Sequence, residues 1–355
     1  MSDVVAPPDV VIDADVLGRQ RTGDETHVHQ LLVGLADGDP GLTVGAVTRW
    51  PAMVPEGVTA YQLDPVHQLT RMIWQLPRLL GRIRPRLAHF QYVVPPLYRG
   101  RSVVTVHDLS YELLPELEDR FDGWALRRLV PPSIRRSELV FTVSEWTKSD
   151  IVSRYGVPPE KIVVTLNGVS DRFTPRGPRP ARPPYLLFVG ALRPRKDPLA
   201  ALEAFVRLGE DDLHLVMVGP DRGLRAEVES FVDRSGIRRR VEIKGHVDDD
   251  ELASLYRGAR CVVLPTRYEG FGLPVVEAMA SGVPVVSTTA GSIPEVAGTA
   301  AVLVPPRDPG ALADGIRTAL ADAPALVAQG LERAARFNWA EVVGRVLEGY
   351  RSVLG

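Results

Sequence analysis

Residues 261–287 read CVVLPTRYEGFGLPVVEAMASGVPVVS and contain the pattern of a strand, a loop, a helix and a second strand. Cys261–Leu264 is a short apolar run, typical of a strand buried on both faces of a parallel sheet. Pro274 suits the first turn of the helix, because its missing N–H group costs nothing there. Gly282 ends the helix before the strand Val283–Ser287. The loop therefore emerges at the carboxyl end of a strand, where doubly wound sheets bind ligands.

The same alternation of short apolar runs and amphipathic helices extends through the chain. Helices are predicted at Leu199–Leu208, Glu251–Gly258 and Ala311–Ala321, among others. Strands are predicted at Val10–Asp13, Thr43–Val47, Val103–Val106, Leu139–Val143, Ile162–Leu166, Tyr185–Val189, His214–Val218, Val241–Lys244, Cys261–Leu264, Val283–Ser287 and Ala301–Val304. This order predicts an α/β protein with doubly wound, Rossmann-like parallel sheets covered by helices on both faces.

The alternation is interrupted at 174–184, TPRGPRPARPP, where five prolines and a glycine exclude regular structure. We therefore expect an N-terminal domain at 1–174, a linker at 175–184 and a C-terminal domain at 185–337. Two sheets of this type bind ligands at their carboxyl edges, so the predicted site is a cleft between the domains.

Composition narrows the class of protein without indicating its chemistry. The 355 residues include 42 Lys+Arg and 44 Asp+Glu, and this balance gives no reason to expect nucleic acid as a partner. Cys261 is the single cysteine, which excludes an intramolecular disulfide and fits a reducing cytoplasm. No segment approaches the ~18–20 apolar residues of a membrane span, and the start MSDVVAPPDV lacks signal-peptide features.

The loop Gly270-Phe271-Gly272-Leu273 is the first candidate binding element. Its backbone N–H groups precede a helix N-terminus, which carries roughly +0.5 of an elementary charge and favours phosphate. The two glycines allow a ligand close to the backbone. Glu277, expected in the first helical turn, offers an acceptor pair suited to the vicinal hydroxyls of a ribose. The alternative is that the Gly-x-Gly turn and Glu277 only cap the helix.

The assembled pattern, Glu269-x7-Glu277 with GFGLP inside and EAMASGVPVV at its end, resembles retaining glycosyltransferase family 4, of the GT-B fold. The resemblance covers nearly the whole chain. Gly190–Asp197, Asn167–Val169 and Ala290–Val296 fit other segments of the family. The last helix, Trp339–Leu354, resembles the segment that crosses back onto the N-terminal domain, so 338–355 is assigned to that domain.

The resemblance implies a role for each residue of a donor site. Glu277 would accept hydrogen bonds from the donor ribose, and Glu269 would position the donor sugar together with backbone amides of the loop. Arg195 and Lys196 would bind the diphosphate and stabilise the leaving group without a metal. The candidate donor-site residues are Gly190, Arg195, Lys196, Glu269, Gly270, Phe271, Gly272, Leu273 and Glu277. The chain departs from many relatives at Ala191, where they place an arginine.

Two further candidates lie in the N-terminal half. Gly23, between the first strand and a helix expected at His27–Ala36, fits the family's glycine loop, but Asp24 and Glu25 stand where small or basic residues are usual. These two acidic residues either cap the helix or contact acceptor hydroxyls. His107 follows the strand Val103–Val106, where the family has a histidine beside the donor sugar. It would donate to a sugar hydroxyl, or its carbonyl would stabilise positive charge at the anomeric carbon.

A basic amphipathic segment, Leu69–Ile83, carries Arg71, Arg78 and Arg82 beside large apolar residues. Such a helix lies on an anionic membrane surface, or it packs on its own sheet with the arginines in water. Pro77 weakens the helical prediction. The acidic run Asp248–Glu251 precedes a helix and is interpreted as its cap, not as a metal site.

These observations predict a retaining, metal-independent transferase that moves a hexose from a nucleotide-diphosphate sugar to an acceptor hydroxyl. No cofactor is expected beyond the donor substrate, for which GDP-mannose is the first choice and UDP-glucose or UDP-N-acetylglucosamine the alternatives. The acceptor is a glycan, a lipid-linked molecule or a small molecule. The expected location is cytoplasmic, with peripheral contact at the inner membrane surface left open.

Two other classes were compared with this prediction. A non-catalytic nucleotide-sugar-binding protein stays open, because Gly23 and Ala191 depart from the family pattern. A phosphorylase of the same fold would need a cofactor lysine, and among the four lysines only Lys196 is expected at the cleft. No residue is an obvious covalent nucleophile, and the mechanism that the resemblance implies is a front-face displacement, in which the departing phosphate helps to deprotonate the acceptor.

Overall fold

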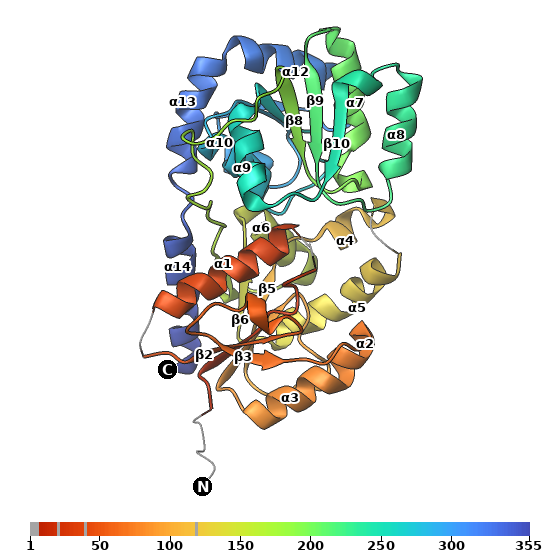
Figure 1. Cartoon of the computed structure of the whole chain (residues 1–355). Coiled ribbons are helices and arrows are strands. Elements are labelled where there is room, and N and C mark those ends of the chain that lie inside the picture. Colours follow the sequence, from red (N-terminus) through yellow and green to blue (C-terminus); the bar gives the residue numbers. More distant parts are fainter. Residues whose placement is uncertain (1–6, 20–21, 39–40, 118–119) are drawn as a thin grey trace. The chain divides into compact units, whose positions relative to one another are not determined.

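The computed structural model describes residues 7–19, 22–38, 41–117 and 120–355 (Figure 1). Contacts divide the chain into two compact units. The N-terminal unit runs to Gly168 and includes Trp339–Gly355, and the C-terminal unit is Val169–Asn338. Residues 175–184, expected as a linker, contain no helix or strand, and the carbonyl of Pro178 accepts a hydrogen bond from Arg257 Nε (2.9 Å) of the C-terminal unit.

The N-terminal unit is built on a parallel sheet of seven strands among the described residues, in the order β3-β2-β1-β4-β5-β6-β7. Val10 of β1 is in register with Val44 on one side and Leu87 on the other. The strands are β1 (Val10–Asp13), β2 (Val44–Thr48), β3 (Thr59–Gln62), β4 (Leu87–Gln91), β5 (Ser102–Val106), β6 (Leu139–Thr142) and β7 (Ile162–Val164). The helices are α1 (Thr22–Gly38), α2 (Gln68–Thr70), the π-helix η2 (Arg71–Gln75), α3 (Leu76–Ile83), α4 (Ser110–Leu113), α5 (Arg120–Arg136), α6 (Glu145–Tyr155) and α14 (Trp339–Leu354), with short 3-10 turns at Pro51–Met53, Pro115–Leu117 and Pro159–Lys161.

The C-terminal unit has a second parallel sheet, in the order β10-β9-β8-β11-β12-β13. Its strands are β8 (Tyr185–Val189), β9 (His214–Val218), β10 (Val241–Gly245), β11 (Cys261–Leu264), β12 (Val285–Thr288) and β13 (Val302–Val304). Its helices are α7 (Pro198–Leu208), α8 (Arg225–Arg234), α9 (Asp249–Gly258), α10 (Leu273–Ala280), α11 (Ile293–Ala297), α12 (Pro309–Ala321) and α13 (Ala323–Ala334), with 3-10 turns at Pro194–Lys196 (η5) and Arg238–Arg240.

The predicted fold class is confirmed, because both sheets are wholly parallel and reverse their strand order beside the first strand of the unit. Two strands escaped prediction. β3 reads Thr-Ala-Tyr-Gln and is a largely exposed edge strand, and β4 has the polar His89 in its middle. Neither is the apolar run that the prediction relied on. His89 is fully buried, with Nδ1 2.6 Å from Tyr350 Oη and Nε2 2.6 Å from Thr105 Oγ1, which explains how a polar residue is accommodated there.

The segment predicted as one helix at Leu69–Ile83 consists of α2, η2 and α3. Pro77 is the second residue of α3 and has no N–H to bond the preceding turn, so that turn widens into the π-helix. The expectation that Arg71 points into water is wrong: its side chain is buried and bonds Asp13. None of the described helices is long and apolar enough to cross a membrane.

Helix α14 completes the core of the N-terminal unit. It packs against α1 and β6, and it buries Val343, Val346 and Tyr350 in the cluster formed by the first strands. Its bounds coincide with the helix expected from the sequence.

Two glycines on α14 differ in the space around them. A Cβ added to Gly349 would lie 2.6 Å from Phe141 Cζ, whereas a Cβ added to Gly344 would meet nothing within 4 Å.

We expect Gly349→Ala to lower the free energy of unfolding by about 1–3 kcal/mol, because the new methyl group overpacks the contact with Phe141. Gly344→Ala on the same helix is the matched control. It should raise the free energy of unfolding by about 0.5–1 kcal/mol, since alanine loses less backbone entropy in a helix. Urea denaturation of both variants measures the difference, and equal effects would contradict this packing of α14.

Candidate active site

The carboxyl ends of β8 and β11, neighbours in the C-terminal sheet, bring the predicted donor-site charges together. Arg195 and Lys196 lie in η5 after β8, and Glu269 lies in the loop after β11. Lys196 Nζ forms an ion pair with Glu269 Oε1, and Arg195 Nη1 lies 3.7 Å from Glu269 Oε2. The Glu269 residue is only 8% exposed. The three charges therefore form one buried cluster with an excess of one positive charge.

Burial and charge compete at this cluster. Burial alone would raise the pKa of Glu269, but Lys196 and Arg195 outweigh it, so the pKa lies below its ordinary value. Burial lowers the pKa of Lys196, and Arg195 adds to this, although Glu269 opposes both. Glu269 is thus held as a carboxylate that already has a cationic partner.

Hydrogen bonds between the two loops fix the cluster. Arg195 Nη1 donates to the carbonyl of Tyr268 (3.2 Å), and the carbonyl of Arg195 accepts from Arg267 N (2.8 Å). Thr266 Oγ1 lies 3.1 Å from the Tyr268 carbonyl and 3.2 Å from the Arg195 carbonyl. Gly190 directly follows β8, and a Cβ there would be in ordinary van der Waals contact with the Lys196 side chain at 3.4 Å.

The backbone of the loop Gly270–Leu273 lies close to neighbouring side chains of the same unit. Gly272 has φ +96°, and a Cβ there would lie 2.6 Å from Ile293 Cδ1, so a side chain is excluded. Phe271 is buried and packs edge-to-face on Phe337, with ring centroids 5.5 Å apart. The glycine-rich turn is followed directly by α10, whose eight residues start at Leu273.

The segment Ala290–Val296 fixes the backbone of Glu269 through hydrogen bonds. Ser292 donates from N (3.0 Å) and from Oγ (3.1 Å) to the Glu269 carbonyl. A Cβ on Gly291 would lie 2.3 Å from the same carbonyl oxygen, so the close approach requires glycine. The segment was expected to match the family, but no role was predicted for Ser292.

Glu277 lies in the second turn of α10, and the expectation of a first-turn position is wrong. The helix begins at Leu273, so Glu277 is its fifth residue. Its Oε2 accepts a hydrogen bond from Tyr256 Oη (2.8 Å), which α9 supplies. Burial raises the pKa of Glu277 to about 7, although the hydrogen bond from Tyr256 favours the charged form. Tyr256 was not predicted, because no local pattern links a tyrosine on α9 to this carboxylate.

In the N-terminal unit, His107 follows β5 and is buried. Its Nε2 lies 2.8 Å from Gln91 Oε1 at the end of β4, and Tyr92 packs on the ring. Burial lowers its pKa to about 4, so the ring is neutral at physiological pH. Since Gln91 Oε1 is an acceptor, Nε2 carries the proton and is engaged. Donation to a sugar hydroxyl would require His107 to leave Gln91.

The prediction of a glycine loop at Gly23 is wrong, because α1 already begins at Thr22. Gly23, Asp24 and Glu25 lie in its first turn, where acidic side chains are favoured by the helix dipole. Glu25 Oε1 accepts from the N–H of Gly18 (2.6 Å), so this acidic side chain ties the preceding loop to the helix. The capping alternative explains these residues.

His27, which the sequence did not single out, belongs to the same group as His107. Its ring packs edge-to-face on His107 at 4.8 Å and on Trp339 at 5.9 Å. Its Nδ1 bonds Asn167 Oδ1 (2.6 Å), and burial lowers its pKa to about 3. The interpretation of the exposed run Asp248–Glu251 as a helix cap is confirmed, because Asp248 accepts a hydrogen bond from Glu251 N (2.8 Å) at the start of α9.

Two doubly wound units, with a cation–carboxylate cluster and a glycine-rich turn at the carboxyl edge of the second, define a glycosyltransferase of the GT-B fold. Residues 170–337 match the family described as glycosyl transferases group 1, and residues 21–173 match glycosyltransferase family 4. The chain belongs to glycosyltransferase family 4 and is mannosyltransferase-like.

Two relatives and one solved structure illustrate the likeness. The chain is 31% identical to O-antigen chain mannosyltransferase B of Escherichia coli in an alignment of 267 residues that covers 71% of this chain and 70% of that protein. It is 34% identical to D-inositol 3-phosphate glycosyltransferase of Geodermatophilus obscurus, covering 74% of this chain and 62% of the relative. The fold matches sucrose-phosphate synthase from Thermosynechococcus elongatus with a TM-score of 0.78 and 21% identity, over 97% of this chain and 98% of that one.

The raised pKa of Glu277 predicts a pH dependence of stability. Because the folded-state pKa of about 7 exceeds the ordinary value of 4.5, the folded protein binds the proton more tightly. The stabilisation is present below pH 4.5 and is lost as pH rises to about 7. Relative to Glu277→Gln, the wild-type free energy of unfolding should fall by about 2 kcal/mol over this interval.

Tyr256→Phe provides the matched test. It removes a hydrogen bond to the charged form, so the loss of stability should extend to higher pH than in the wild type. Urea denaturation at a series of pH values measures all three proteins. Parallel curves for the wild type and Glu277→Gln would show that Glu277 has an ordinary pKa.

Proposed function

We propose that the chain transfers mannose from GDP-mannose to an acceptor hydroxyl, with retention of configuration and without a metal. The cluster of Arg195, Lys196 and Glu269 is the observation that carries this proposal. A diphosphate develops negative charge as the glycosidic bond breaks, and a guanidinium fork beside an ammonium is suited to stabilising it. The C-terminal unit would hold the donor, and the N-terminal unit would supply acceptor contacts.

The excess positive charge of the cluster supports diphosphate binding. Lys196 is paired with Glu269 in the donor-free protein, so an incoming diphosphate would take over the ammonium group. Glu269 would then accept hydrogen bonds from donor sugar hydroxyls. Glu277 has one oxygen bonded to Tyr256 and the other without a hydrogen bond to the described residues, which leaves an acceptor for a ribose hydroxyl.

Retention is proposed to follow a front-face displacement. The bond between the anomeric carbon and the phosphate oxygen breaks, the acceptor oxygen bonds the same face, and the acceptor proton goes to the departing phosphate. Glu269 is a poor candidate for the nucleophile of a double displacement, since in the proposed complex it accepts hydrogen bonds from hydroxyls of the donor sugar and keeps Arg195 as a cationic neighbour. The neutral His107 would contribute its carbonyl to the positive anomeric carbon, because its Nε2 is engaged with Gln91.

The choice of sugar rests on the relatives. The relative from Escherichia coli is a mannosyltransferase of the O-antigen chain, as is another relative from Salmonella typhimurium, which is 28% identical over 242 residues. The relative from Geodermatophilus obscurus glycosylates D-inositol 3-phosphate, which favours a phosphorylated small-molecule acceptor as the second candidate. UDP-glucose and UDP-N-acetylglucosamine are the alternative donors.

We expect GDP-mannose to raise the thermal unfolding temperature more than UDP-glucose or UDP-N-acetylglucosamine does. Arg195→Gln should raise the donor Kd about 10- to 100-fold, since one charged hydrogen bond contributes about 1.5–3 kcal/mol. Arg239→Gln, an exposed arginine of the same unit, is the control and should leave the Kd unchanged.

Activity measurements test metal dependence, the configuration of the product and the alternative of a non-catalytic binding protein. We expect full activity in EDTA. We also expect a product with the anomeric configuration of the donor sugar, which NMR coupling constants would show. Strict dependence on Mg²⁺ or Mn²⁺ would contradict the metal-free mechanism. Donor binding without transfer to any acceptor of a glycan, lipid-linked or small-molecule panel would favour a nucleotide-sugar-binding protein.

We further propose that the segment 68–83 makes a peripheral contact with an anionic membrane surface, at the cytoplasmic side. Trp74, Leu69 and Ile73 are 65%, 41% and 37% exposed, which is unusual for large apolar side chains on one segment. Arg78 and Arg82 are exposed beside them. Apolar side chains with flanking arginines fit the boundary between headgroups and acyl chains.

The double variant Ile73→Ser, Trp74→Ser should reduce co-sedimentation with vesicles of phosphatidylglycerol and phosphatidylcholine at least fivefold. Trp124→Ser, another exposed tryptophan of the N-terminal unit, is the control. Both changes replace exposed side chains, so the unfolding temperature should stay the same. Equal vesicle binding by the wild type and the double variant would rule out this contact.

A further inference from the structure

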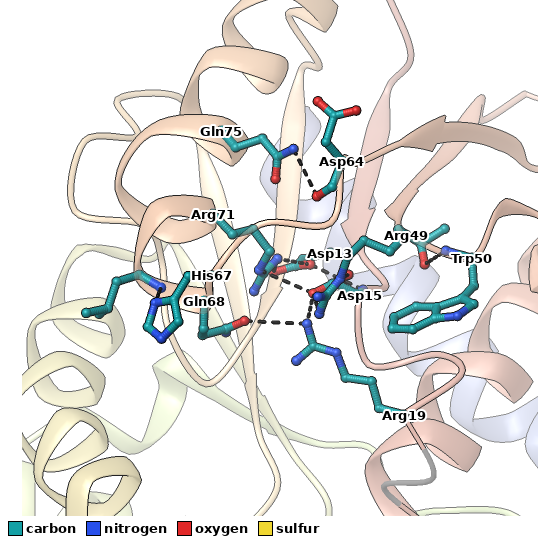
Figure 2. A network of polar contacts seen from close by, with 12 residues as sticks. Asp13, Asp15, Arg19, Arg49, Trp50, Asp64, His67, Gln68, Arg71 and Gln75 are labelled. Carbon is teal, nitrogen blue, oxygen red and sulfur yellow. Dashed lines mark hydrogen bonds and ion pairs between the residues drawn. The ribbon is translucent and has the colours of Figure 1, made fainter.

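Two buried carboxylates and three arginines meet at the carboxyl end of β1 (Figure 2). Arg71 Nη1 bonds both oxygens of Asp13, at 2.9 and 3.1 Å. Arg49 makes a two-pronged contact with Asp15, from Nε (2.8 Å) and Nη2 (3.0 Å). Arg19 also forms an ion pair with Asp15. The cluster joins β1, the residue after β2 and the π-helix η2, which are far apart in the sequence.

The cluster lies where an open sheet binds ligands. β1 has β2 on one side and β4 on the other, so the strand order reverses at its carboxyl end. Doubly wound sheets bind their ligands in the crevice at this reversal. The candidate donor cluster lies at the equivalent reversal of the other sheet, between β8 and β11. Position alone therefore favours a ligand at Asp13 and Asp15.

The charges of the cluster do not balance. Three guanidinium groups face two carboxylates, and Asp15, which is 2% exposed, has three of them within reach. Arg71 is 7% exposed, and its Nε lies 3.3 Å from Asp15 Oδ2 without being aligned for a hydrogen bond. Arg19 Nε is likewise buried without a hydrogen-bond partner among the described residues. A buried donor without an acceptor is costly, so these N–H groups would stabilise an anion bound at this position.

Anchoring of the π-helix accounts for only part of this arrangement. The pair of Arg71 and Asp13 is buried and sufficient to hold η2 on the sheet. Arg49 and Arg19 are partly exposed and approach from the other side of Asp15, as Figure 2 shows. The Arg49 guanidinium is held over the Trp50 ring at 5.0 Å, which fixes its direction. Arg49 compensates the buried charge of Asp15, which leaves the guanidinium group of Arg19 as the positive charge in excess over the two aspartates.

We propose that Arg19, Arg49 and Arg71 form a binding site for a phosphate group carried by the acceptor. Three guanidinium groups supply several N–H donors in a small volume, and tetrahedral phosphate accepts them through several oxygens. Asp13 and Asp15 hold the guanidinium groups in place and keep the empty site from carrying three bare charges. The inference rests on the proposed transferase function and specifies its acceptor as an anionic, phosphorylated molecule.

Hydrogen–deuterium exchange with inorganic phosphate, against chloride at equal ionic strength, tests the site directly. Phosphate should slow exchange in peptides covering 13–19 and 67–75. Peptides covering 190–196 and 266–273 report the donor cluster independently in the same samples. A response in the second set only would overturn the phosphate site and leave the donor proposal standing. A response in the first set only would count against the donor proposal alone.

Arg19→Gln sharpens the test, because it leaves two arginines facing two aspartates. It should raise the half-saturating phosphate concentration for peptides 13–19 and 67–75 at least tenfold, without lowering the unfolding temperature. Arg154→Gln, an exposed arginine of α6, is the matched control and should bind phosphate as the wild type does. Arg49→Gln serves if Arg19→Gln folds poorly. A lower unfolding temperature with unchanged phosphate binding would show a purely structural network and overturn the proposal.

Two further probes distinguish a soluble phosphorylated acceptor from a lipid-linked one. A soluble acceptor predicts that glycerol 3-phosphate protects the same peptides and that vesicles add nothing. A lipid-linked acceptor predicts that vesicles containing phosphatidic acid protect peptide 13–19 better than phosphatidylcholine vesicles do, and that Arg19→Gln removes this protection. Protection of 67–75 alone would report only the membrane contact proposed for 68–83 and would count against a lipid-linked acceptor. Protection by neither probe, with none from inorganic phosphate, would overturn the proposal.

Discussion

Each sheet reverses its strand order beside its first strand, and the placement of buried charge in both units depends on this reversal. β1 lies between β2 and β4, and β8 lies between β9 and β11. The connections that leave neighbouring strands at such a point run to opposite faces of the sheet and open a crevice. Asp13 and Asp15 follow β1, and Arg195 and Lys196 follow β8. The parallel fold thus creates two comparable positions for polar side chains, and the sequence fills both with charges.

Both charge clusters are compensated but not neutral. A buried ion costs several kcal/mol unless it is paired, so isolated carboxylates at these crevices would destabilise the units. Glu269 is paired with Lys196 and Arg195, and Asp15 has Arg49, Arg19 and Arg71 around it. In each case the cations exceed the carboxylates by one. The carboxylates therefore orient the cations, and on the proposals made above the remaining positive charge would bind an anionic group of a substrate.

The sequence predicted the elements whose pattern is local and missed those that depend on distant partners. Strands such as β8 and β11 are uninterrupted apolar runs, and their bounds agree with the structure. β4 was missed because His89 breaks its apolar run, and its partners Tyr350 and Thr105 cannot be found from spacing. Arg195, Lys196 and Glu269 could be placed in loops after two strands from local patterns, but the ion pairs between them could not be predicted. The inward position of Arg71 follows from the π-helix before Pro77, and no periodicity of 3.6 residues would place it there.

The ion pair between Lys196 and Glu269 affects which ligands the proposed donor site would bind. If a diphosphate draws Lys196 away, Glu269 keeps Arg195 as a cationic neighbour but loses an ion pair in a crevice where it is 8% exposed. In the proposed complex the hydroxyls of the donor sugar would replace Lys196 as hydrogen-bond donors to this carboxylate. A sugar attached to the diphosphate would therefore offset part of the free energy lost with the ion pair. On the proposed function, phosphate binding and sugar recognition are coupled through one carboxylate, and the ion pair of the empty site favours the nucleotide sugar over the free nucleotide.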